Sequence, residues 1–295
     1  MRWLVIVNPN AGHARRSLRD LPATLSQGGL TDVEIQTSSQ PGDATILARE
    51  GVRNGVDRVL VVGGDGTIHE VIQALAGSST PLGLLPCGTA NLLAKELGYP
   101  SVPFAELIHL LKTAEVRRMD LGRLNDRYFA LMTGIGFDAW VVAAVPPRLK
   151  RLAGRGASVL AAIRHLINTY SVTLEIDNDG ITRKMRTPQV IVANSNHYAA
   201  NRTLHPDISI WDGELNLLVT HSGKWGGFTL LQQGIALMLN RLYKRRNLQC
   251  EKARRISIAG DRPQPVQMDG EAVSTWPLEF SIEPAALPVL ILSSD

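Results

Sequence analysis

The sequence predicts an α/β N-terminal domain with a parallel, doubly wound sheet, followed by a C-terminal antiparallel β-sandwich domain. Through residue 123, short apolar runs alternate with helical patterns, which is typical of buried parallel strands joined by crossover helices. From residue 124, longer stretches alternate apolar and polar residues between turn signals, which indicates strands with one buried face. We therefore expect domains at 1–123 and 124–284, and a last strand at 285–295 that belongs to the second domain or returns to the first.

The individual elements follow from these patterns. In the first domain, apolar runs predict strands at 3–7, 33–37, 58–64 and 81–86, and helical patterns fall at 42–54, 67–75 and 92–97. In the second domain, alternation predicts strands at 128–133, 171–176, 189–194, 214–220, 255–260 and 277–282, with helical interruptions at 156–168 and 227–243. Turn signals such as Asp179-Gly180 and Asp212-Gly213 separate the later strands.

Composition narrows the class of protein. With 295 residues, 44% of them hydrophobic and 20% charged, the chain can bury a large core. No apolar stretch approaches the roughly 18 to 20 residues that a membrane-spanning helix needs, so contact with lipid is expected to be peripheral. Cys87 and Cys250 lie far apart, support neither a disulfide framework nor a zinc site, and fit a reducing cytosol. The net charge of +4 suits an anionic membrane, a phosphate-rich ligand or nucleic acid.

A glycine-rich loop follows the third predicted strand. Gly63, Gly64 and Gly66 surround Asp65, and a helix is expected to begin at Thr67. Glycines allow the backbone to approach a ligand, and the N–H groups at a helix start attract phosphate. A carboxylate beside phosphates would orient Mg²⁺ or a donor group. The alternative is a tight strand-to-helix turn that the aspartate caps.

Two further loops also follow apolar strands. The segment PCGTAN, residues 86–91, precedes a predicted helix, and its Thr89 and Asn91 offer a hydroxyl and an amide to a nucleotide. The segment NPNAG, residues 8–12, ends the first strand and would suit the rim of the same site. Each of these loops alone could equally be a plain turn. Loops at the ends of strands in one parallel sheet would lie side by side, which favours a shared site.

Together these segments resemble the catalytic-domain superfamily of diacylglycerol kinases, which includes bacterial lipid kinases, sphingosine kinases and ceramide kinases. The similarity consists of NPNAG at 8–12, GGDGT at 63–67, PCGTAN at 86–91 and Asp269-Gly270-Glu271, in the family's order across nearly the whole chain. The resemblance implies a nucleotide-binding α/β domain, a β-sandwich, and an ATP site in the cleft between them. It implies a Mg²⁺-dependent lipid kinase with a place in phospholipid metabolism.

By position, the resemblance assigns roles to three groups of residues. Nucleotide contacts would come from Asn8, Pro9, Asn10, Ala11, Gly12, Thr37, Gly63, Gly64, Asp65, Gly66, Thr67, Ile68, His69, Gly88, Thr89 and Asn91. Glu271 would be the general base, with Asp65 and Asp269 as the other catalytic carboxylates. A structural Mg²⁺ would be held at Ser209, Asp212 and Glu214, although Asp212-Gly213 could equally be an ordinary turn.

Phosphoryl transfer needs a carboxylate that accepts the hydroxyl proton, and Asp269-Gly270-Glu271 offers two. On a regular strand both carboxylates would face one way, but Gly270 permits a turn that separates their roles. We expect Glu271 to act as the base and Asp269 as its electrostatic neighbour or a Mg²⁺ partner. A simple hairpin turn is the alternative for this tripeptide.

Two positions depart from the family pattern. His69 stands where many relatives have Asn, and Asn91-Leu92 stands where diacylglycerol-specific bacterial enzymes often have Asn-Asp. The second departure puts diacylglycerol itself in doubt as the substrate. Diacylglycerol, phosphatidylglycerol, a sphingoid base, ceramide and a polyprenol therefore all remain candidates.

Two other functions would use some of the same residues. An NAD kinase also uses GGDGT, but PCGTAN and the late Asp269-Gly270-Glu271 favour a lipid kinase. A catalytically silent nucleotide- or lipid-binding protein would be favoured if Asp65 or Glu271 were missing, and both are present. The segment 134–139 matches the dinucleotide pattern GxGxxG/A, yet no ribose-binding acid follows, so we expect a structural strand bend there.

Basic residues among apolar ones predict where the protein meets lipid. The segments 148–165 and 241–246 mix Lys and Arg with apolar residues, as surfaces that dock on anionic headgroups do. Ordinary solvated surface is the alternative for each segment. We expect a membrane lipid as the partner, no nucleic acid, and a cytoplasmic protein at the inner face of the membrane. The oligomeric state stays open, with a homodimer among the options.

Overall fold

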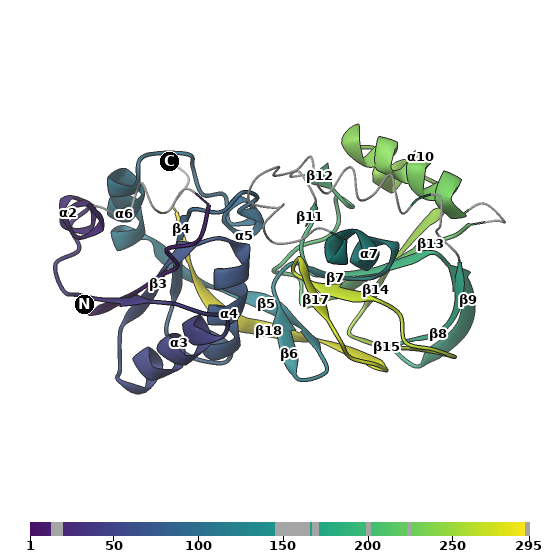
Figure 1. The fold of residues 1–295 in the computed structure, drawn as a ribbon, viewed down its shortest axis with the longest axis horizontal. Helices are drawn as coiled ribbons and strands as arrows, with labels where there is room; N and C mark the ends of the chain where they lie inside the picture. Colours follow the sequence, from purple (N-terminus) through teal and green to yellow (C-terminus); the bar gives the residue numbers. More distant parts are fainter. Residues whose placement is uncertain (13–19, 145–165, 167–170, 199–201, 223–225, 293–295) are drawn as a thin grey trace. The chain divides into compact units, whose positions relative to one another are not determined.

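The computed structural model describes the whole chain except residues 13–19, 145–165, 167–170, 199–201, 223–225 and 293–295 (Figure 1). The described chain forms two compact units. The first unit consists of residues 1–121 and 285–295, and the second of residues 122–284. The basic segment 148–165 and almost all of the helix expected at 156–168 lie outside the described residues.

The first unit contains a parallel sheet in the strand order β2-β1-β3-β4-β18. Its strands are β1 (Trp3–Val7), β2 (Val33–Thr37), β3 (Arg58–Gly63), β4 (Leu82–Pro86) and the end of β18 (Leu278–Ile291). The central strands are rich in Val, Ile and Leu because both faces of the sheet are covered, and β1 is buried over its whole length.

Helices cover both faces of this sheet. Trp3, Val5 and Val7 point to a core shared with α2 (Leu21–Gln27) and α6 (Phe104–Thr113). Side chains alternate along a strand, so Leu4 points to the opposite face, where it packs closely against Gly51 of α3 (Asp43–Arg53). Helix α4 (Asp65–Leu75) packs beside α3 and against β3, and α5 (Leu92–Glu96) follows β4. The sheet is therefore doubly wound, as predicted.

The second unit is a β-sandwich. One antiparallel sheet has the order β14-β13-β10-β7-β16-β17. Its strands are β14 (Leu248–Ala253), β13 (Leu215–Thr220), β10 (Gln189–Ala193), β7 (Met132–Gly136), β16 (Val266–Met268) and β17 (Glu271–Val273). The facing strands are β18 up to Pro284, β15 (Arg255–Gly260), β8 (Val172–Asn178) and β9 (Ile181–Thr187), with β6 (Arg127–Phe129) and the end of β5 (Glu115–Leu124) beside them.

Alternation along β10 shows how the sandwich is filled. Val190 and Val192 point into the core between the two sheets, where they meet Phe129 and Phe280. Ile191 and Ala193 point to the outer face, which α10 (Gly226–Met238) and the 3-10 turn η2 (Leu242–Lys244) cover. Helix α7 (Phe137–Ala143) follows β7, and the short strands β11 (His197–Tyr198) and β12 (Arg202–Thr203) pair antiparallel.

The predicted fold class is confirmed for both units, and the differences are local. Helix α4 begins at Asp65, two residues before the expected start, so the aspartate itself lies in the first helical turn. The helix expected at 227–243 ends at Met238 and gives way to η2. Helix α6 and strand β5 were not predicted. Within the described part of the chain, the structure contains no helix that combines the length and the hydrophobicity needed to cross a membrane.

Candidate active-site residues

Three loops meet at the carboxyl ends of neighbouring strands in the first unit. The loop of Asn8 to Gly12 follows β1, Gly64 follows β3, and the loop of Cys87 to Asn91 follows β4. Since β3 lies between β1 and β4 in the sheet, the loops are brought side by side. The hydroxyl-bearing Thr37 ends β2, where it is aligned with Val7 of β1. Thus the sheet brings to one edge the loops that lie far apart in the sequence.

Asn8 ties the first loop to helix α4. Its Nδ2 donates a 2.9 Å hydrogen bond to Oγ1 of Thr67, and its Oδ1 accepts one of 2.9 Å from the N–H of Asn10. Its own N–H donates to the carbonyl of Val62 at the end of β3. The side chain of Asn8 therefore fixes the loop's shape, while Asn10 remains exposed.

Glycine is required where the loops touch. Gly12 has a φ of +37°, and a Cβ placed there would lie 2.1 Å from the carbonyl oxygen of Cys87. A Cβ on Gly88 would lie 2.7 Å from the Cα of Gly64. Both neighbours are backbone atoms, so a larger residue would push whole loops apart. The close approach of these backbones thus depends on glycine at both positions.

The start of α4 is joined to the start of α5. Oδ1 of Asp65 accepts a 2.8 Å hydrogen bond from the N–H of Leu92. Asn91 has a φ of +50° and closes the loop on itself, because its Oδ1 accepts from the N–H of Gly88 at 2.8 Å and its Nδ2 donates to the carbonyl of Gly88 at 2.9 Å. The first N–H groups of an α-helix have no partner within the helix and carry partial positive charge. The first turn of α4 therefore combines these N–H groups with the carboxylate of Asp65.

The remaining predicted nucleotide residues divide by exposure. Thr67, Ile68 and His69 are buried on the inner side of α4, where they support the loops. Thr89 is exposed, and Gly66 is partly exposed. The loops and the first turn of α4 therefore present backbone and small polar groups, which suit the phosphates of a nucleotide.

Glu271 lies in the second unit, directly after a two-residue hairpin turn. Asp269 and Gly270 have φ values of +49° and +86° and join β16 to β17, so that Glu271 is paired with Met268. Two central residues with positive φ are the signature of the tight turn that matches the twist of a hairpin. The Glu271 side chain is exposed, as a group that must meet a substrate would be.

Asp269 holds this hairpin to the neighbouring backbone. Its Oδ2 accepts a hydrogen bond of 2.8 Å from the N–H of Ala130, and its Oδ1 accepts from Leu131 at 2.9 Å and Met132 at 3.0 Å. Its own N–H donates to the carbonyl of Met132. The two carboxylates of the motif are thereby separated, with Asp269 turned to backbone and Glu271 left accessible.

A buried polar network supports the same turn and was not predicted. Oε1 of Gln267 accepts a 2.8 Å hydrogen bond from the N–H of Gly270, and its Nε2 donates to Oδ2 of Asp138 at 2.7 Å. The hydroxyl of Tyr198 donates to the other oxygen of Asp138. Burial raises the pKa of Asp138 above its usual value and raises that of Tyr198 well above its own. A Cβ on Gly134 would lie 1.9 Å from Oδ2 of Asp138.

This network explains the segment that matched a dinucleotide pattern. Gly136 ends β7 with a φ of +85°, and α7 begins at Phe137. Gly134 makes room for the protein's own carboxyl group, so the glycines serve internal packing at a bend between strand and helix. Periodicity could not reveal the network, because its members lie far apart in the sequence.

The candidate metal residues surround a lysine. Nζ of Lys252 lies 2.6 Å from Oε2 of Glu214 and 3.2 Å from Oδ2 of Asp212, and these bonds raise its pKa. Oδ1 of Asp212 accepts from the N–H of Glu214 at 3.1 Å, and Oγ of Ser209 accepts from the N–H of Trp211 at 3.3 Å. An ammonium group thus holds the position that a cation shared by the two carboxylates would take. This arrangement does not fit a divalent metal.

Comparison with known proteins identifies similarity over the whole chain. Residues 2–124 match the family of the diacylglycerol kinase catalytic domain, and residues 132–291 match that of the YegS C-terminal NAD kinase beta sandwich-like domain. The chain is 26% identical over 283 residues to the diacylglycerol kinase of Bacillus subtilis (strain 168), covering 95% of this chain and 92% of that relative. It is 31% identical over 221 residues to the "Probable lipid kinase YegS-like" of Chromohalobacter salexigens, covering 74% and 70%.

Solved structures agree on the fold. A crystal structure of a diacylglycerol kinase from Bacillus anthracis str. Sterne matches with a TM-score of 0.73 at 22% identity, over 98% of this chain and 96% of that chain. At this identity the match shows a common fold of both units.

Proposed function

The chain belongs to the family of kinases that join a diacylglycerol kinase catalytic domain to a YegS-type β-sandwich, and we propose that it transfers the γ-phosphate of ATP to a hydroxyl group of a membrane lipid. Family membership makes it a phosphotransferase. The identity of the donor, the acceptor and the residues that act on them is our proposal. The observation that carries it is the exposed Glu271, held by a buried network on a rigid turn.

The three loops of the first unit would hold the phosphates of ATP. The first turn of α4 points its N–H groups and its partial positive charge at them. Gly12, Gly64 and Gly88 allow the loop backbones to touch one another, which would leave the ligand bordered by backbone. Asn10 and Thr89, both exposed, supply further polar contacts. Asp65 in the same turn would orient the Mg²⁺ that accompanies ATP, which neutralises the charge of the phosphate oxygens.

Glu271 would accept the proton of the acceptor hydroxyl as its oxygen attacks the γ-phosphorus. Such proton transfer contributes roughly 10²- to 10⁴-fold to a rate. Asp269 and Gln267 would act through Glu271, since they fix the turn that precedes it. For this reason we describe Asp269 as a positioning residue and Glu271 as the catalytic base.

The reaction can be tested with labelled nucleotide. Purified protein would be incubated with γ-labelled ATP, Mg²⁺ and a panel of lipids in mixed micelles, with NAD as a parallel acceptor. We expect label in one lipid class, lost when Mg²⁺ is chelated and reduced by roughly 10²-fold or more in Glu271→Gln. Glu175→Gln, an exposed glutamate on strand β8 of the same unit, is the matched control and should keep full activity.

Two outcomes would overturn the proposal. Label in NAD alone would make the protein an NAD kinase. Tight binding of ATP without label in any acceptor would make it a binding protein. A lipid product that forms equally well with Glu271→Gln would keep the reaction but remove Glu271 from the role of base.

A further inference from the structure

Helix α10 presents a row of large apolar side chains to solvent. Phe228, Leu231, Ile235 and Met238 are 62%, 45%, 55% and 47% exposed, and Leu239 directly after the helix is 61% exposed. Their spacing of three and four residues places them on one face of the helix. We call these five residues the α10 apolar face. Single exposed apolar residues are common, but a contiguous group on one element marks an interaction site.

The opposite face of the helix is firmly attached to the sandwich. Leu237 belongs to the buried cluster with Ile191 and Leu218 on the outer face of the sheet. Oε1 of the buried Gln233 accepts a 3.0 Å hydrogen bond from Oγ1 of Thr220. These contacts fix the rotation of α10 about its axis, so that the α10 apolar face points to solvent.

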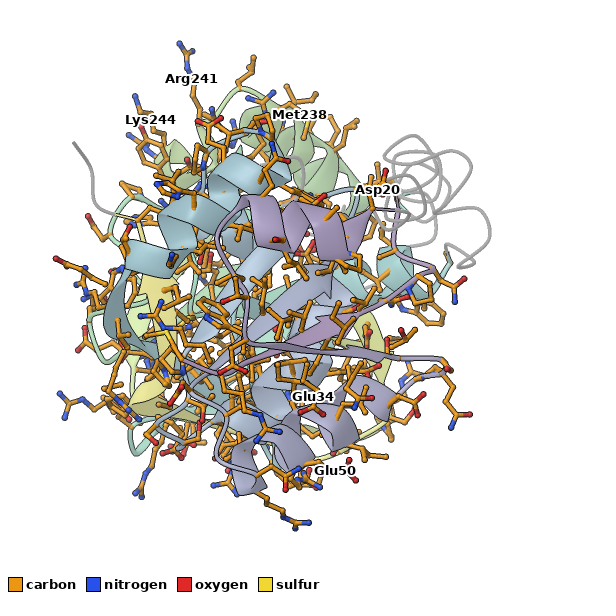
Figure 2. All side chains as sticks on the ribbon, turned by 90° about the vertical axis from the view of Figure 1, so that its left-hand side faces the viewer. Asp20, Glu34, Glu50, Met238, Arg241 and Lys244 are labelled. Carbon is orange, nitrogen blue, oxygen red and sulfur yellow. The ribbon has the colours of Figure 1, made fainter. Side chains whose placement is uncertain are left out.

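Along the chain, the charged residues that flank this face are all basic. No Asp or Glu occurs between Glu214 and Glu251, and three exposed cations follow the helix at Arg241, Lys244 and Arg246. We call these three residues the basic cluster. Figure 2 shows the side chains of Arg241 and Lys244 projecting away from the protein. Arg245, which lies between members of the cluster, donates a 2.6 Å hydrogen bond to Oε1 of Gln232 and so ties this segment to α10.

We propose that the α10 apolar face and the basic cluster form the surface by which this protein lies on an anionic phospholipid bilayer. The apolar side chains would insert among the headgroups, and the cations would contact their phosphates. This inference rests on the proposed function, because a kinase whose acceptor is a membrane lipid must reach the bilayer.

Charge selects the bilayer over a second copy of the chain. A second copy of the chain would bring the same net charge of +4 and the same basic cluster, so it offers no concentration of anionic groups to pair with these cations. A bilayer containing phosphatidylglycerol supplies the opposite charge and an apolar interior. Hence the combination of an uncharged apolar face with cations at one end fits a lipid surface.

Vesicle binding tests the surface without using activity. The full chain would be sedimented with vesicles of phosphatidylcholine alone and of phosphatidylcholine mixed with phosphatidylglycerol. Leu231→Gln/Ile235→Gln should weaken binding to the mixed vesicles by at least about tenfold. Arg241→Gln/Lys244→Gln should remove the preference for phosphatidylglycerol and the dependence on salt. Ile46→Gln on α3 alters a residue of matched exposure, 54%, and should bind as the wild type does.

Activity on a short-chain lipid separates this inference from the proposed function. With an acceptor dissolved as monomers, all three variants should keep the wild-type kcat, which also shows that they fold. Loss of phosphotransfer in every protein would count against the proposed function alone. Equal vesicle binding by Leu231→Gln/Ile235→Gln and wild type would overturn the docking surface. So would a wild-type dimer that this variant converts to a monomer, because the face would then be an interface between copies.

Discussion

The N–H of Leu92 donates a 2.8 Å hydrogen bond to Oδ1 of Asp65, although the two residues are 27 positions apart in the sequence. The bond joins the first turn of α4 to the first turn of α5, and so joins two of the three loops. Asp65 therefore has a structural task in addition to the role we propose beside Mg²⁺. Two substitutions can separate these roles.

Asp65→Ala removes both the acceptor and the charge, whereas Asp65→Asn keeps an oxygen that can accept from Leu92. We expect Asp65→Ala to lower the free energy of unfolding by about 1.5–3 kcal/mol, the range for a hydrogen bond to a charged group. Asp65→Asn should unfold close to wild type in urea but lose most of kcat. Wild-type kcat in Asp65→Asn would show that the charge plays no part in phosphoryl transfer.

The Asp269 turn has a close counterpart elsewhere in the second unit. Asp179 and Gly180 form the same kind of turn between β8 and β9, and the Asp179 carboxylate also accepts backbone N–H groups, from Arg254 and Arg255. Asn tolerates positive φ, so Asp→Asn at either turn preserves the backbone. The substitution replaces one acceptor oxygen of the carboxylate with an NH2 group, which cannot accept a hydrogen bond.

We expect Asp269→Asn and Asp179→Asn to destabilise the protein similarly, by about 1–3 kcal/mol each. Only Asp269→Asn should also lower kcat, because Glu271 follows that turn directly. Urea unfolding and steady-state kinetics with the labelled lipid would measure both effects. An equal kcat in the two variants would mean that Asp269 does not position Glu271.

The ion pair of Lys252 with Glu214 and Asp212 leads to a prediction about metal. Without nucleotide, the wild-type melting temperature should be the same in EDTA and in Mg²⁺. Lys252→Met leaves two carboxylates without their ammonium partner, so Mg²⁺ should now stabilise the protein, by about 1.4 kcal/mol at ten times its Kd. Equal stabilisation of both proteins by Mg²⁺ would show that the lysine yields its place to the metal.

The buried carboxyl group of Asp138 makes stability depend on pH. Burial raises its pKa in the folded protein above the usual 3.8. The folded state thus binds this proton more tightly than the unfolded chain does. The contribution of Asp138 to the free energy of unfolding is therefore full below pH 3.8 and is lost as the pH rises through the folded-state pKa. Asn is neutral at every pH, so Asp138→Asn should remove the part of the loss of stability with rising pH that comes from this carboxyl group.

Urea midpoints between about pH 4 and pH 8 would measure the effect. Asp177 is a control of opposite sign, since hydrogen bonds from Thr182 and Gly180 lower the pKa of its exposed carboxyl group. An unchanged pH profile in Asp138→Asn would show that this group keeps its charge when folded.

Local sequence patterns were enough for much of the fold. Buried strands such as Arg58–Gly63 and the Asp179-Gly180 turn depend on neighbouring residues, and both occur as predicted. The sequence could not predict which residues, far apart in the chain, contact one another in the fold. The Asp269 carboxylate accepts hydrogen bonds from the backbone at 130–132, and Lys252 forms an ion pair with Asp212. The exposure of Ile235 also depends on which face of α10 the sheet covers.

Strand β18 contributes residues to both units and lies between β4 and β15 in one sheet. Up to Pro284 it pairs with β15, and beyond a bend at Ala285, whose N–H donates to Asp120, it runs parallel to β4 and places Leu290 in the core of the first unit. A ribosome adds roughly 5–20 residues per second and exposes the chain from its N-terminus. The sheet that carries the three loops lacks this strand until residues 285–291 have emerged. The first unit's part of the sheet is therefore completed only after the sandwich has been synthesised.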